Sequence, residues 1–465
     1  MKQFILLIAG SALFASCGIY STYQRSGEPL AGLDSLYRDT TDTYAVIKGD
    51  TTNFGNTPWQ EVFTEPQLQA LITKALANNT NMREADLTIQ QAEAGLKVAR
   101  LAYYPSLTFS PQGTVSSWDF GKATKTYNFP VTASWQIGAF GKLRNTKKQQ
   151  EVSLEQTRVA KQATQTSIIA SVANMYYTLQ MLDEQLRTTQ ATIDIWSENV
   201  RAMEVMKTGG MTTEAAVAQA KANYYNLLST VPTLKQSIRK TENALCVVLH
   251  ETPHPIERGT FSADNFPASL KAGVPLQLLN NRPDVRIAEL NLASALYGVN
   301  LAKSAFCPSL TITGQGGWTN SSGVGIVNPG KILASAIASL TQPIFANGQL
   351  RANLKISKLQ YEAAQLDYEQ ALLAAGQEVS DALTAYQTAQ QQEEVCQKQV
   401  DVLATALDKT QLLYQHSTGT TYLETLTAQQ SLIQAQLTLI SDKFDKVQAA
   451  ITLYQALGGG RETGN

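Results

Sequence analysis

Two long stretches of helix-forming residues constrain what this chain can fold into more than any other feature. The first runs from Leu143 to Lys207 without a single Pro or Gly, and the second runs from Leu350 to Gln415. At 1.5 Å per residue, each stretch predicts a helix of about 100 Å, which is wider than a compact domain. Because such a helix is stable only when it packs along its length, we expect a wall of helices that lie side by side.

The composition fits a wall that is wet on both surfaces. Only 16% of the 465 residues are charged, and Gln, Ala, Thr and Ser take their place. Ala, Leu, Val and Tyr positions supply a narrow packing seam along each long helix. With 37 basic residues against 38 acidic ones, the charge balance gives no reason to expect nucleic acid as a partner.

Strand-like patterns lie between the helical stretches. Thr126 to Ile137, TYNFPVTASWQI, has an apolar residue at every odd position, which is the two-residue period of a strand with two different faces. The preceding stretch SLTFSPQGTV is also strand-like, and a polar loop joins the two. We therefore expect a β-hairpin over 106–137.

The second half of the chain repeats the order of the first half. Residues 105–108 (PSLT) align with 308–311 (PSLT), and Leu143-Arg144 aligns with Leu350-Arg351. This pattern indicates a tandem duplication of helix, hairpin, long helix, turn and return helix. The expected parts are a first repeat at 59–251 (helix from Trp59 to Tyr104, hairpin 106–137, long helix 143–207, return helix 212–249), a linker at 252–275, a second repeat at 276–457 (helix, hairpin 309–344, long helix 350–415, return helix 422–457) and a tail at 458–465.

The hairpins are long enough to cross a bilayer, but one chain cannot close them into a barrel. Four strands of about ten residues leave open edges, whose backbone groups would be unpaired in hydrocarbon. Closure requires several copies, with eight strands in a dimer or twelve in a trimer. Water would then lie on one face and lipid on the other; the expected lipid-facing residues are Leu107, Phe109, Tyr127, Phe129, Val131, Trp135, Leu310, Ile312 and Trp318. The alternative is a soluble hairpin packed on a helical core.

The N-terminus indicates export. Met1-Lys2 is a short basic region, Phe4 to Ala15 is apolar, and Ser16-Cys17 places a small residue before a cysteine. This pattern resembles a bacterial lipoprotein signal, with residues 1–16 removed, lipid attached to Cys17 and an extended segment at 17–58. An ordinary secretory signal cut nearby is the alternative. After residue 16 no apolar run is long enough for a transmembrane helix. If the chain crosses a membrane, it must therefore do so with its strands.

Two stretches resemble a known family. LLNNRPDVRIAELNLASALYGVNLAKSAFCPSLTITG and TYLETLTAQQSLIQAQLTLISDKFDKVQAAITLYQALGGG are similar to the outer-membrane efflux family of TolC- and OprM-type exit ducts. Members of that family typically contain RPDV-x-x-AE and end on LY-x-ALGGG. Trp59 to Ala85 also resembles their first helix, so the resemblance covers nearly the whole mature chain.

The resemblance implies an α+β membrane protein in which a long α-helical barrel, the periplasmic tunnel, joins a transmembrane antiparallel β-barrel. It implies a homotrimer with four strands per chain and twelve in total, lipid-anchored in the outer membrane of a Gram-negative bacterium and extending into the periplasm. The implied partners are outer-membrane lipid, a periplasmic adaptor and an inner-membrane transporter of the resistance-nodulation-division class. The duct itself would be passive, would pass drugs, toxic compounds or metal ions, and would need no cofactor beyond the lipid on Cys17.

The two Gly-containing turns between long helix and return helix are the expected periplasmic tips. Glycine allows a tight reversal there, and the resemblance implies an adaptor contact and a gate beside these turns. The candidate tip and gate residues are Gly209, Gly210, Glu214, Gly419, Thr420, Thr421 and Glu424. The two carboxylates among them are better explained as solvated helix-start residues, which the helix dipole favours, than as a selectivity ring.

One cluster suggests a metal site but is better explained structurally. Cys246, His250 and His254 are spaced four apart, as ligands on one helix face would be. Pro253 interrupts that face and a closed site needs a fourth ligand, so we expect no metal. Cys246, Cys307 and Cys396 are expected as buried free thiols. The chain has no P-loop, GxSxG or HExxH motif, and we expect no enzyme.

Two functions from different classes remain open. The first is an exit duct, for a tripartite efflux system or for type I protein secretion. The second is a lipid-anchored helical scaffold that bridges envelope layers without conducting. They differ at the hairpins, since a scaffold has no need of four bilayer-length strands that are free of charge.

Overall fold

The chain was analysed as a computed structural model, which describes residues 20–24, 54–117, 119, 121–138, 140–262, 282–319, 331–416 and 422–460. It divides into two compact units that each combine segments from both halves of the sequence. Unit 1 comprises Met1–Glu28, Leu87–Val159 and Ile287–Gln370, and unit 2 comprises Pro29–Asp86, Ala160–Arg286 and Ala371–Asn465. Within the described ranges, every helix is too short or too polar to be a membrane-spanning helix.

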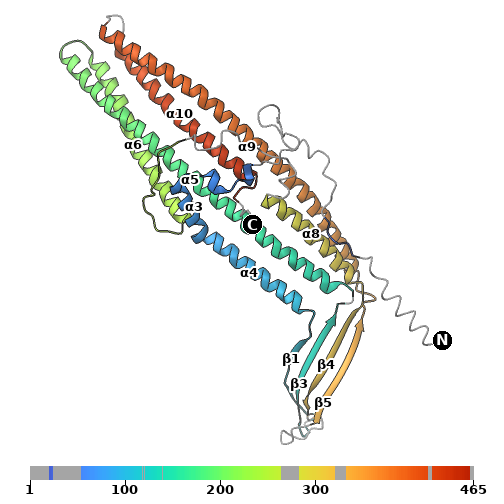
Figure 1. Ribbon diagram of the computed structural model, residues 1–465. Coiled ribbons are helices and arrows are strands. Elements are labelled where there is room, and N and C mark those ends of the chain that lie inside the picture. The colour runs from blue at the N-terminus through green and yellow to red at the C-terminus, as the bar shows by residue number, and fades with distance from the viewer. Residues whose placement is uncertain are drawn as a thin grey trace. The chain divides into compact units, whose positions relative to one another are not determined.

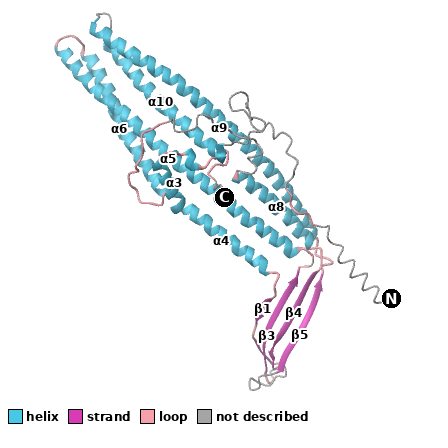
Figure 2. Ribbon diagram, in the orientation of Figure 1, coloured by secondary structure: helices cyan, strands magenta, loops and turns pink. Residues whose placement is uncertain are grey.

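Unit 1 contains one antiparallel sheet (Figure 2). Its strands are β1 (Ser106–Phe109), β2 (Gln112–Ser116), β3 (Thr124–Ile137), β4 (Ser309–Thr319) and β5 (Lys331–Thr341). They are arranged in the order β1-β3-β4-β5, and β2 also pairs with β3. The two hairpins, far apart in sequence, thus join through the β3–β4 pair.

Each hairpin is connected directly to helices at both ends (Figure 1). Helix α4 (Thr80–Leu101) leads into β1, and α5 (Lys142–Thr208) follows β3. In the second half α8 (Pro283–Ser304) leads into β4, and α9 (Gln349–His416) follows β5. Gly141 and Gly348, with φ values of +75° and +78°, supply the left-handed backbone conformation just before α5 and α9.

Unit 2 is helical. Besides long portions of α5 and α9, it contains η2 (Phe54–Asn56), α2 (Trp59–Val62), α3 (Pro66–Asn78), α6 (Glu214–Val248) and α10 (Tyr422–Ala456). Its core includes fully buried large side chains from α3, α5 and α10, among them Leu68, Ile72, Tyr176 and Tyr454. This burial of apolar surface is what holds such long helices in place, because helix propensity alone stabilises them little.

The continuous helix expected from Trp59 to Tyr104 is wrong. The segment forms α2, α3 and α4, and α4 ends at Leu101. Pro66 occupies the first turn of α3, where its missing N–H costs no hydrogen bond. Asn79 separates α3 from α4: its Oδ1 accepts from Asn81 N (2.9 Å) and its Nδ2 donates to Val248 O (2.8 Å).

The expected first strand of the 106–137 hairpin is also wrong in detail. It is split into β1 and β2 around Ser110-Pro111, so the sheet has five strands in place of four. Pro111 lacks the N–H that a continuous ladder needs, which accounts for the break. The strand expected to run to Ile344 ends at Thr341, whereas the two long helices begin and end within one residue of their expected limits.

Candidate functional site

The register of the sheet gathers the predicted lipid-facing residues on one face. Phe129 lies opposite Trp318, and Trp135 lies opposite Ile312, in the β3–β4 pair. Directly opposed residues of an antiparallel pair share a face. This apolar face includes all nine predicted positions: Leu107, Phe109, Tyr127, Phe129, Val131, Trp135, Leu310, Ile312 and Trp318.

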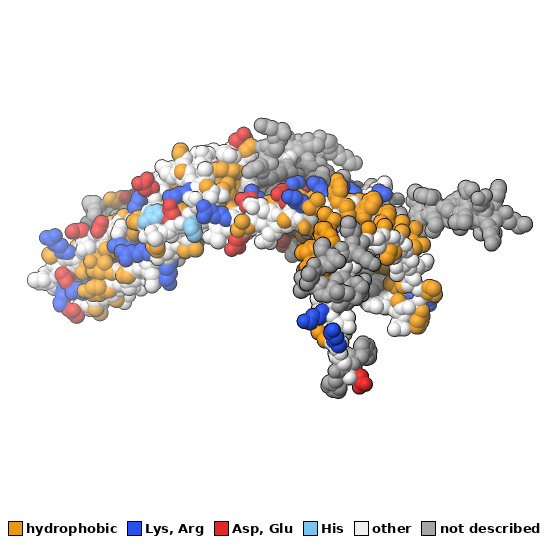
Figure 3. Space-filling model, turned by 90° about the horizontal axis from the view of Figure 1, so that it is seen from below, with side chains coloured by type: hydrophobic (Ala, Val, Ile, Leu, Met, Phe, Trp, Pro, Cys, Tyr) orange, Lys and Arg blue, Asp and Glu red, His pale blue; other side chains and the backbone are white. Residues whose placement is uncertain are grey.

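Much of the apolar face is open to solvent in a single chain. Leu107 is 73% exposed and Trp318 is 54% exposed. In Figure 3 hydrophobic side chains gather over the part of the surface that carries the sheet, whereas charged side chains are scattered over the helical part. A contiguous exposed apolar surface of this kind marks a place that another molecule or a membrane covers.

The opposite face of β3 and β4 is polar and neutral. It carries Thr132, Ser134 and Gln136 from β3, which lie opposite Gln315, Thr313 and Thr311 of β4. On β5, Ile337 lies opposite Thr313 of β4 on this side of the sheet. Hydroxyl and amide groups of this kind can be satisfied by water, so the two faces of the sheet differ in polarity.

Exposed apolar residues also occur at the junctions between strands and helices, and we call them the junction collar. Its members are Tyr103 and Tyr104 between α4 and β1, Phe306 between α8 and β4, and Ile344 and Phe345 between β5 and α9. Trp135 of β3 reaches the collar, because its Nε1 donates to Tyr103 O (2.9 Å). Aromatic residues with one apolar and one polar side suit a membrane–water interface.

The first tip is a helix reversal closed by two glycines in unit 2. Gly210 has φ +71°, and hydrogen bonds run from Gly210 N to Lys207 O (3.0 Å) and from Met211 N to Met206 O (2.8 Å), which is a Schellman C-cap. Helix α6 then begins at Glu214, and the Thr213 hydroxyl accepts from Ala216 N (3.2 Å). The predicted turn therefore has a definite cap at each side.

Ion pairs and an apolar cluster connect the two helices below this tip. Lys207 pairs with Glu214, and Lys221 pairs with Glu204 at 2.7 Å. The hydrogen bond and charge of Lys221 lower the pKa of Glu204. The cluster beneath is buried and consists of Trp196, Met203, Val217, Ala220 and Leu426, so α10 contributes to the same end of unit 2. The sequence interpretation missed the pair formed by Glu204 and Lys221, because its members lie on different helices.

The second tip is described only in part. Gly419, Thr420 and Thr421 lie outside the described residues, as does Cys17 near the N-terminus. Glu424 is exposed in the first turn of α10, where the helix dipole favours a carboxylate. On α9, the hydroxyl of Tyr414 donates to the Met206 sulfur (3.1 Å), which ties the end of α9 to the end of α5.

A groove of about 560 Å³ lies over α5, between α6 and α10. Its lining residues are uncharged and include Asn226 and Thr230 from α6, Gln434 from α10 and Trp196 from α5, but more of the lining surface is apolar than polar. The Trp196 indole N–H is buried without a hydrogen-bond partner among the described residues. An uncharged groove between helices, with apolar surface in its lining, is a shape that the apolar face of a partner helix can enter.

The side chains of Cys246, His250 and His254 do not come together as one group of ligands in the described part of the chain. No group of three or more His, Cys, Asp and Glu side chains in the described ranges could hold a metal ion. Cys246 is buried, and its sulfur lies 3.4 Å from His254 Nδ1, whereas His250 has φ +60° and its Nδ1 lies 3.3 Å from Thr80 Oγ1. Cys396 is buried as expected, but Cys307 is only half-buried.

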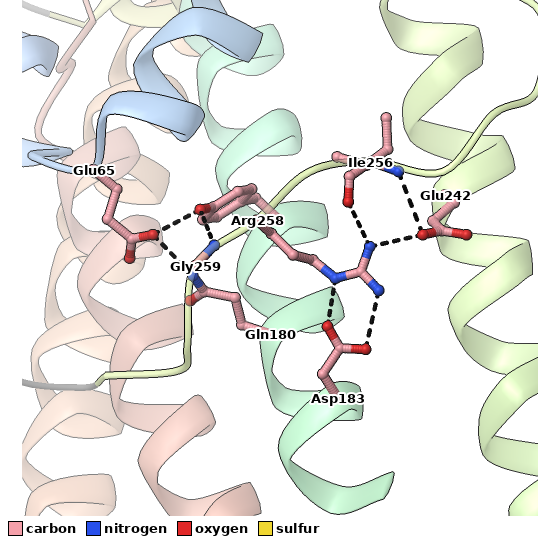
Figure 4. A network of polar contacts seen from close by, with 8 residues as sticks. Glu65, Gln180, Asp183, Glu242, Ile256, Arg258 and Gly259 are labelled. Atoms are coloured by element: carbon pink, nitrogen blue, oxygen red, sulfur yellow. Dashed lines mark hydrogen bonds and ion pairs between the residues drawn. The ribbon is translucent and has the colours of Figure 1, made fainter. Parts of the chain in front are cut away.

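The segment after α6 is held in unit 2 by a polar network (Figure 4). Arg258 donates to both oxygens of Asp183 (2.5 and 3.0 Å) and to Glu242 (2.7 Å). The hydrogen bond with Asp183 raises the pKa of Arg258 further above its usual value, against the effect of burial. Beside it, Glu65 accepts from Tyr176 (2.7 Å) and Gln180 (2.8 Å).

The two motifs that carry the family resemblance meet in unit 2. Arg282 of the RPDV motif is buried and donates to Ala456 O (2.9 Å) in the LY-x-ALGGG motif. It also pairs with Asp284 and Glu378, both at 2.6 Å. The pKa of Asp284 is lowered overall. Burial acts to raise it, but the hydrogen bond and the charge of Arg282 have the larger, opposite effect. Both motifs thus contribute to the packing of the helical wall.

Comparisons with known proteins agree with this architecture. The family model described as "Outer membrane efflux protein" matches residues 71–249 and 274–459. The chain is 28% identical over 447 residues to the cation efflux system protein CusC of Escherichia coli O6:H1 (strain CFT073), covering 96% of each chain. It is 28% identical over 460 residues to the probable outer membrane lipoprotein SilC of Salmonella typhimurium, covering 98% of each.

Solved structures give the same picture. A crystal structure of CusC aligns with a TM-score of 0.83 at 27% identity, covering 95% of this chain and 99% of that one. The open state of the MtrE outer membrane channel of Neisseria gonorrhoeae aligns with a TM-score of 0.80 at 26% identity, covering 90% and 97%. The similarity therefore extends over both units.

Proposed function

Because this chain belongs to the outer membrane efflux protein family, we propose that it is a passive exit duct through which an efflux system moves small solutes across the outer membrane. The observation that carries the proposal is the two-faced sheet. Nine large apolar side chains lie on one face of the described strands, and neutral polar side chains lie on the other face of β3 and β4. In the duct the apolar face contacts lipid, and the polar face lines a water-filled lumen.

Closure of the duct needs further copies of the chain. The described sheet ends on β1 and β2 at one side and on β5 at the other. Open strand edges are not tolerated in hydrocarbon, since each unpaired backbone group there costs several kcal/mol. We propose that three copies close the barrel, β5 of one copy pairing with the β1–β2 edge of the next. The long helices of the three copies then form the tunnel wall.

The proposed partners are the outer membrane, a periplasmic adaptor and an inner-membrane transporter. Acylated Cys17 anchors the chain in the outer membrane, and the junction collar lies at the surface of that membrane. A periplasmic adaptor contacts the tip around Gly209 and Gly210 and the groove over α5. The inner-membrane transporter, of the resistance-nodulation-division class, supplies the energy. No chemistry is required of the duct, which is not an enzyme.

A lumen lined by neutral hydroxyl and amide groups selects weakly among solutes. Relatives include the cation efflux system protein CusC and the solvent efflux pump outer membrane protein SrpC of Pseudomonas putida, which is 28% identical over 409 residues. The pump therefore selects which solute is exported. The same lumen could pass drugs, toxic compounds or metal ions. A type I secretion duct would use the same wall.

Conductance across a planar lipid bilayer tests the proposal. The purified full-length protein should insert from detergent and conduct salt in discrete steps, and trypsin treatment on the periplasmic side should raise the open fraction if the tip is closed. A protein that binds the bilayer but never conducts, even after its tips are cleaved, would support the non-conducting scaffold instead.

A further inference from the structure

Three methionines surround the first tip, and we call them the tip methionines. Met203, Met206 and Met211 lie in the stretch MEVMKTGGM (203–211), which holds three of the chain's seven methionines. Their exposure is graded, because Met203 has no exposed surface, Met206 is half-buried and Met211 is 75% exposed. An oxidant must reach the sulfur of a thioether to react with it, so the three residues should differ strongly in reactivity.

Met211 is part of the turn as well as being exposed. It follows Gly210, and its N–H donates to Met206 O (2.8 Å) in the Schellman cap. An apolar contact between these two positions of the cap commonly accompanies this hydrogen bond. The Met211 side chain folds back over the turn, because its Cγ would lie 3.9 Å from a Cβ added at Gly209. Its thioether therefore supplies the apolar contact of the cap while it stays open to solvent.

Met206 connects the turn to the rest of unit 2 and is shielded there. Its sulfur accepts a hydrogen bond from the Tyr414 hydroxyl of α9 (3.1 Å). Its side chain packs against the buried cluster that contains Trp196 and Met203. The hydrogen bond engages a lone pair that an oxidant would attack, and the packing restricts approach to the sulfur. Met206 should therefore react more slowly than Met211.

We propose that Met211 is an oxidation site through which hydrogen peroxide loosens the first tip of the duct. A sulfur lone pair forms an S–O bond as the peroxide O–O bond breaks, and the departing hydroxide takes the proton of the transferred oxygen and leaves as water. The thioether is thus oxidised by two electrons, and the peroxide is reduced. The sulfoxide is polar, so it is hydrated at the expense of its apolar contact with Met206. This inference rests on the proposed tip of the duct and adds a modification to it.

The other contacts of the tip confine the effect to the turn. Lys207 pairs with Glu214 across the reversal, and the Thr213 hydroxyl caps the start of α6. The buried cluster around Trp196 joins the two helices below the turn. Oxidation of Met211 therefore loosens the reversal and leaves both helices folded. Methionine sulfoxide reductases restore the thioether, so the change is reversible.

Peptide mapping tests the site in the purified full-length protein treated with hydrogen peroxide. Complete trypsin digestion separates Met211, in the peptide 208–221, from Met203 and Met206, in the peptide 202–207. The sulfoxide should form roughly tenfold faster in 208–221 than in 202–207, because exposure controls access to the sulfur. Y414F should raise the rate in 202–207 and leave the rate in 208–221 unchanged. Equal rates in the two wild-type peptides would overturn the assignment of the site.

Limited trypsin cleavage of the native protein after Lys207 tests the loosening. Peroxide treatment should raise the cleavage rate roughly fourfold, which is the effect of losing one buried methylene group. M211L keeps the apolar contact but lacks the thioether, so its cleavage rate should not respond to peroxide. The matched control M181L, at a half-buried methionine elsewhere on α5, should respond as the wild type does. An unchanged rate in the oxidised wild type, or the same response in M211L, would overturn the inference.

Conductance of the same preparations separates the two proposals. A protein that conducts but whose tip cleavage ignores peroxide would refute the inference about Met211 and leave the duct intact. A protein whose tip loosens on oxidation but which never conducts would refute the duct and leave the oxidation site intact.

Discussion

At the scale of single residues, Arg258 holds the segment after α6 against two helices of unit 2. The Arg258 and Glu242 side chains are only 13% and 12% exposed. Removing one partner of a buried ion pair leaves the other charged and unpaired, which costs about 3 kcal/mol. We therefore expect R258M to lower the midpoint of urea unfolding in detergent, followed by circular dichroism.

The matched control for that variant is R187M. Arg187 pairs with Glu184 one helical turn away, but its side chain is 72% exposed. Exposed pairs of this kind contribute about 0–1 kcal/mol, so R187M should leave the midpoint nearly unchanged. If both variants shift the midpoint equally, burial of the Arg258 network has no special role in stability.

Gly210 gives a second residue-scale prediction, at the tip. It has φ +71° and no atoms within 4 Å of an added Cβ, so G210A introduces backbone strain of about 1 kcal/mol and no clash. Local opening of the turn should rise roughly fivefold, and trypsin should cleave after Lys207 correspondingly faster.

Gly209 provides the control for the tip, because an added Cβ there would meet only ordinary contacts of 3.6 Å or more. G209A should therefore keep the wild-type cleavage rate. A faster rate in G209A than in G210A would show that the left-handed conformation does not limit opening of the turn.

At the scale of elements, the two faces of β3 make opposite predictions for neighbouring residues. Val131 lies on the apolar face and Thr132 on the polar face. An Arg that faces lipid near the bilayer centre costs about 2–4 kcal/mol, whereas a lumen-facing Arg is solvated. V131R should therefore reduce the assembled protein in outer membranes, measured by heat-modifiable migration in gels, while T132R should assemble normally.

T132R also has a readout of its own. A positive charge in the lumen should shift the ion selectivity of the bilayer conductance toward anions. Normal assembly of V131R together with failure of T132R would mean that the faces are assigned the wrong way round.

The elements also show what the sequence could predict. The alternation in 126–137 predicted the shared face correctly, because the two-residue period is set by local backbone geometry. The long helices were located within a residue because glycines lie beside their ends in the sequence, Gly141 and Gly209 for α5 and Gly348 for the start of α9. The break at Asn79 was missed because the carbonyl that its side chain binds belongs to Val248.

Features that depend on distant partners were not predictable from local pattern. Arg258 lies 75 residues from Asp183, and Asn300, whose side chain is hydrogen-bonded to the Ser21 backbone, lies 279 residues from Ser21. Nothing in the sequence around Arg258 or Asn300 distinguishes it from the other polar residues. Only the fold brings each of them next to its partner. The candidate tip was located by its glycines, but the ion pair of Glu204 with Lys221 had no local signal.

At the scale of the whole molecule, the open sheet edges call for several copies, and the family resemblance implies three. Two copies would close a barrel whose interior side chains fill, while three leave room for an aqueous channel. The polar face of β3 and β4 requires that room, because its hydroxyl and amide groups need water. We therefore expect the detergent-solubilised protein to have three times the mass of the lipidated chain. Single-particle electron microscopy should show a three-fold cylinder longer than about 100 Å, since each long helix alone has about that length. A dimer would contradict the aqueous lumen, and a monomer without bound detergent would show that the apolar face never meets lipid.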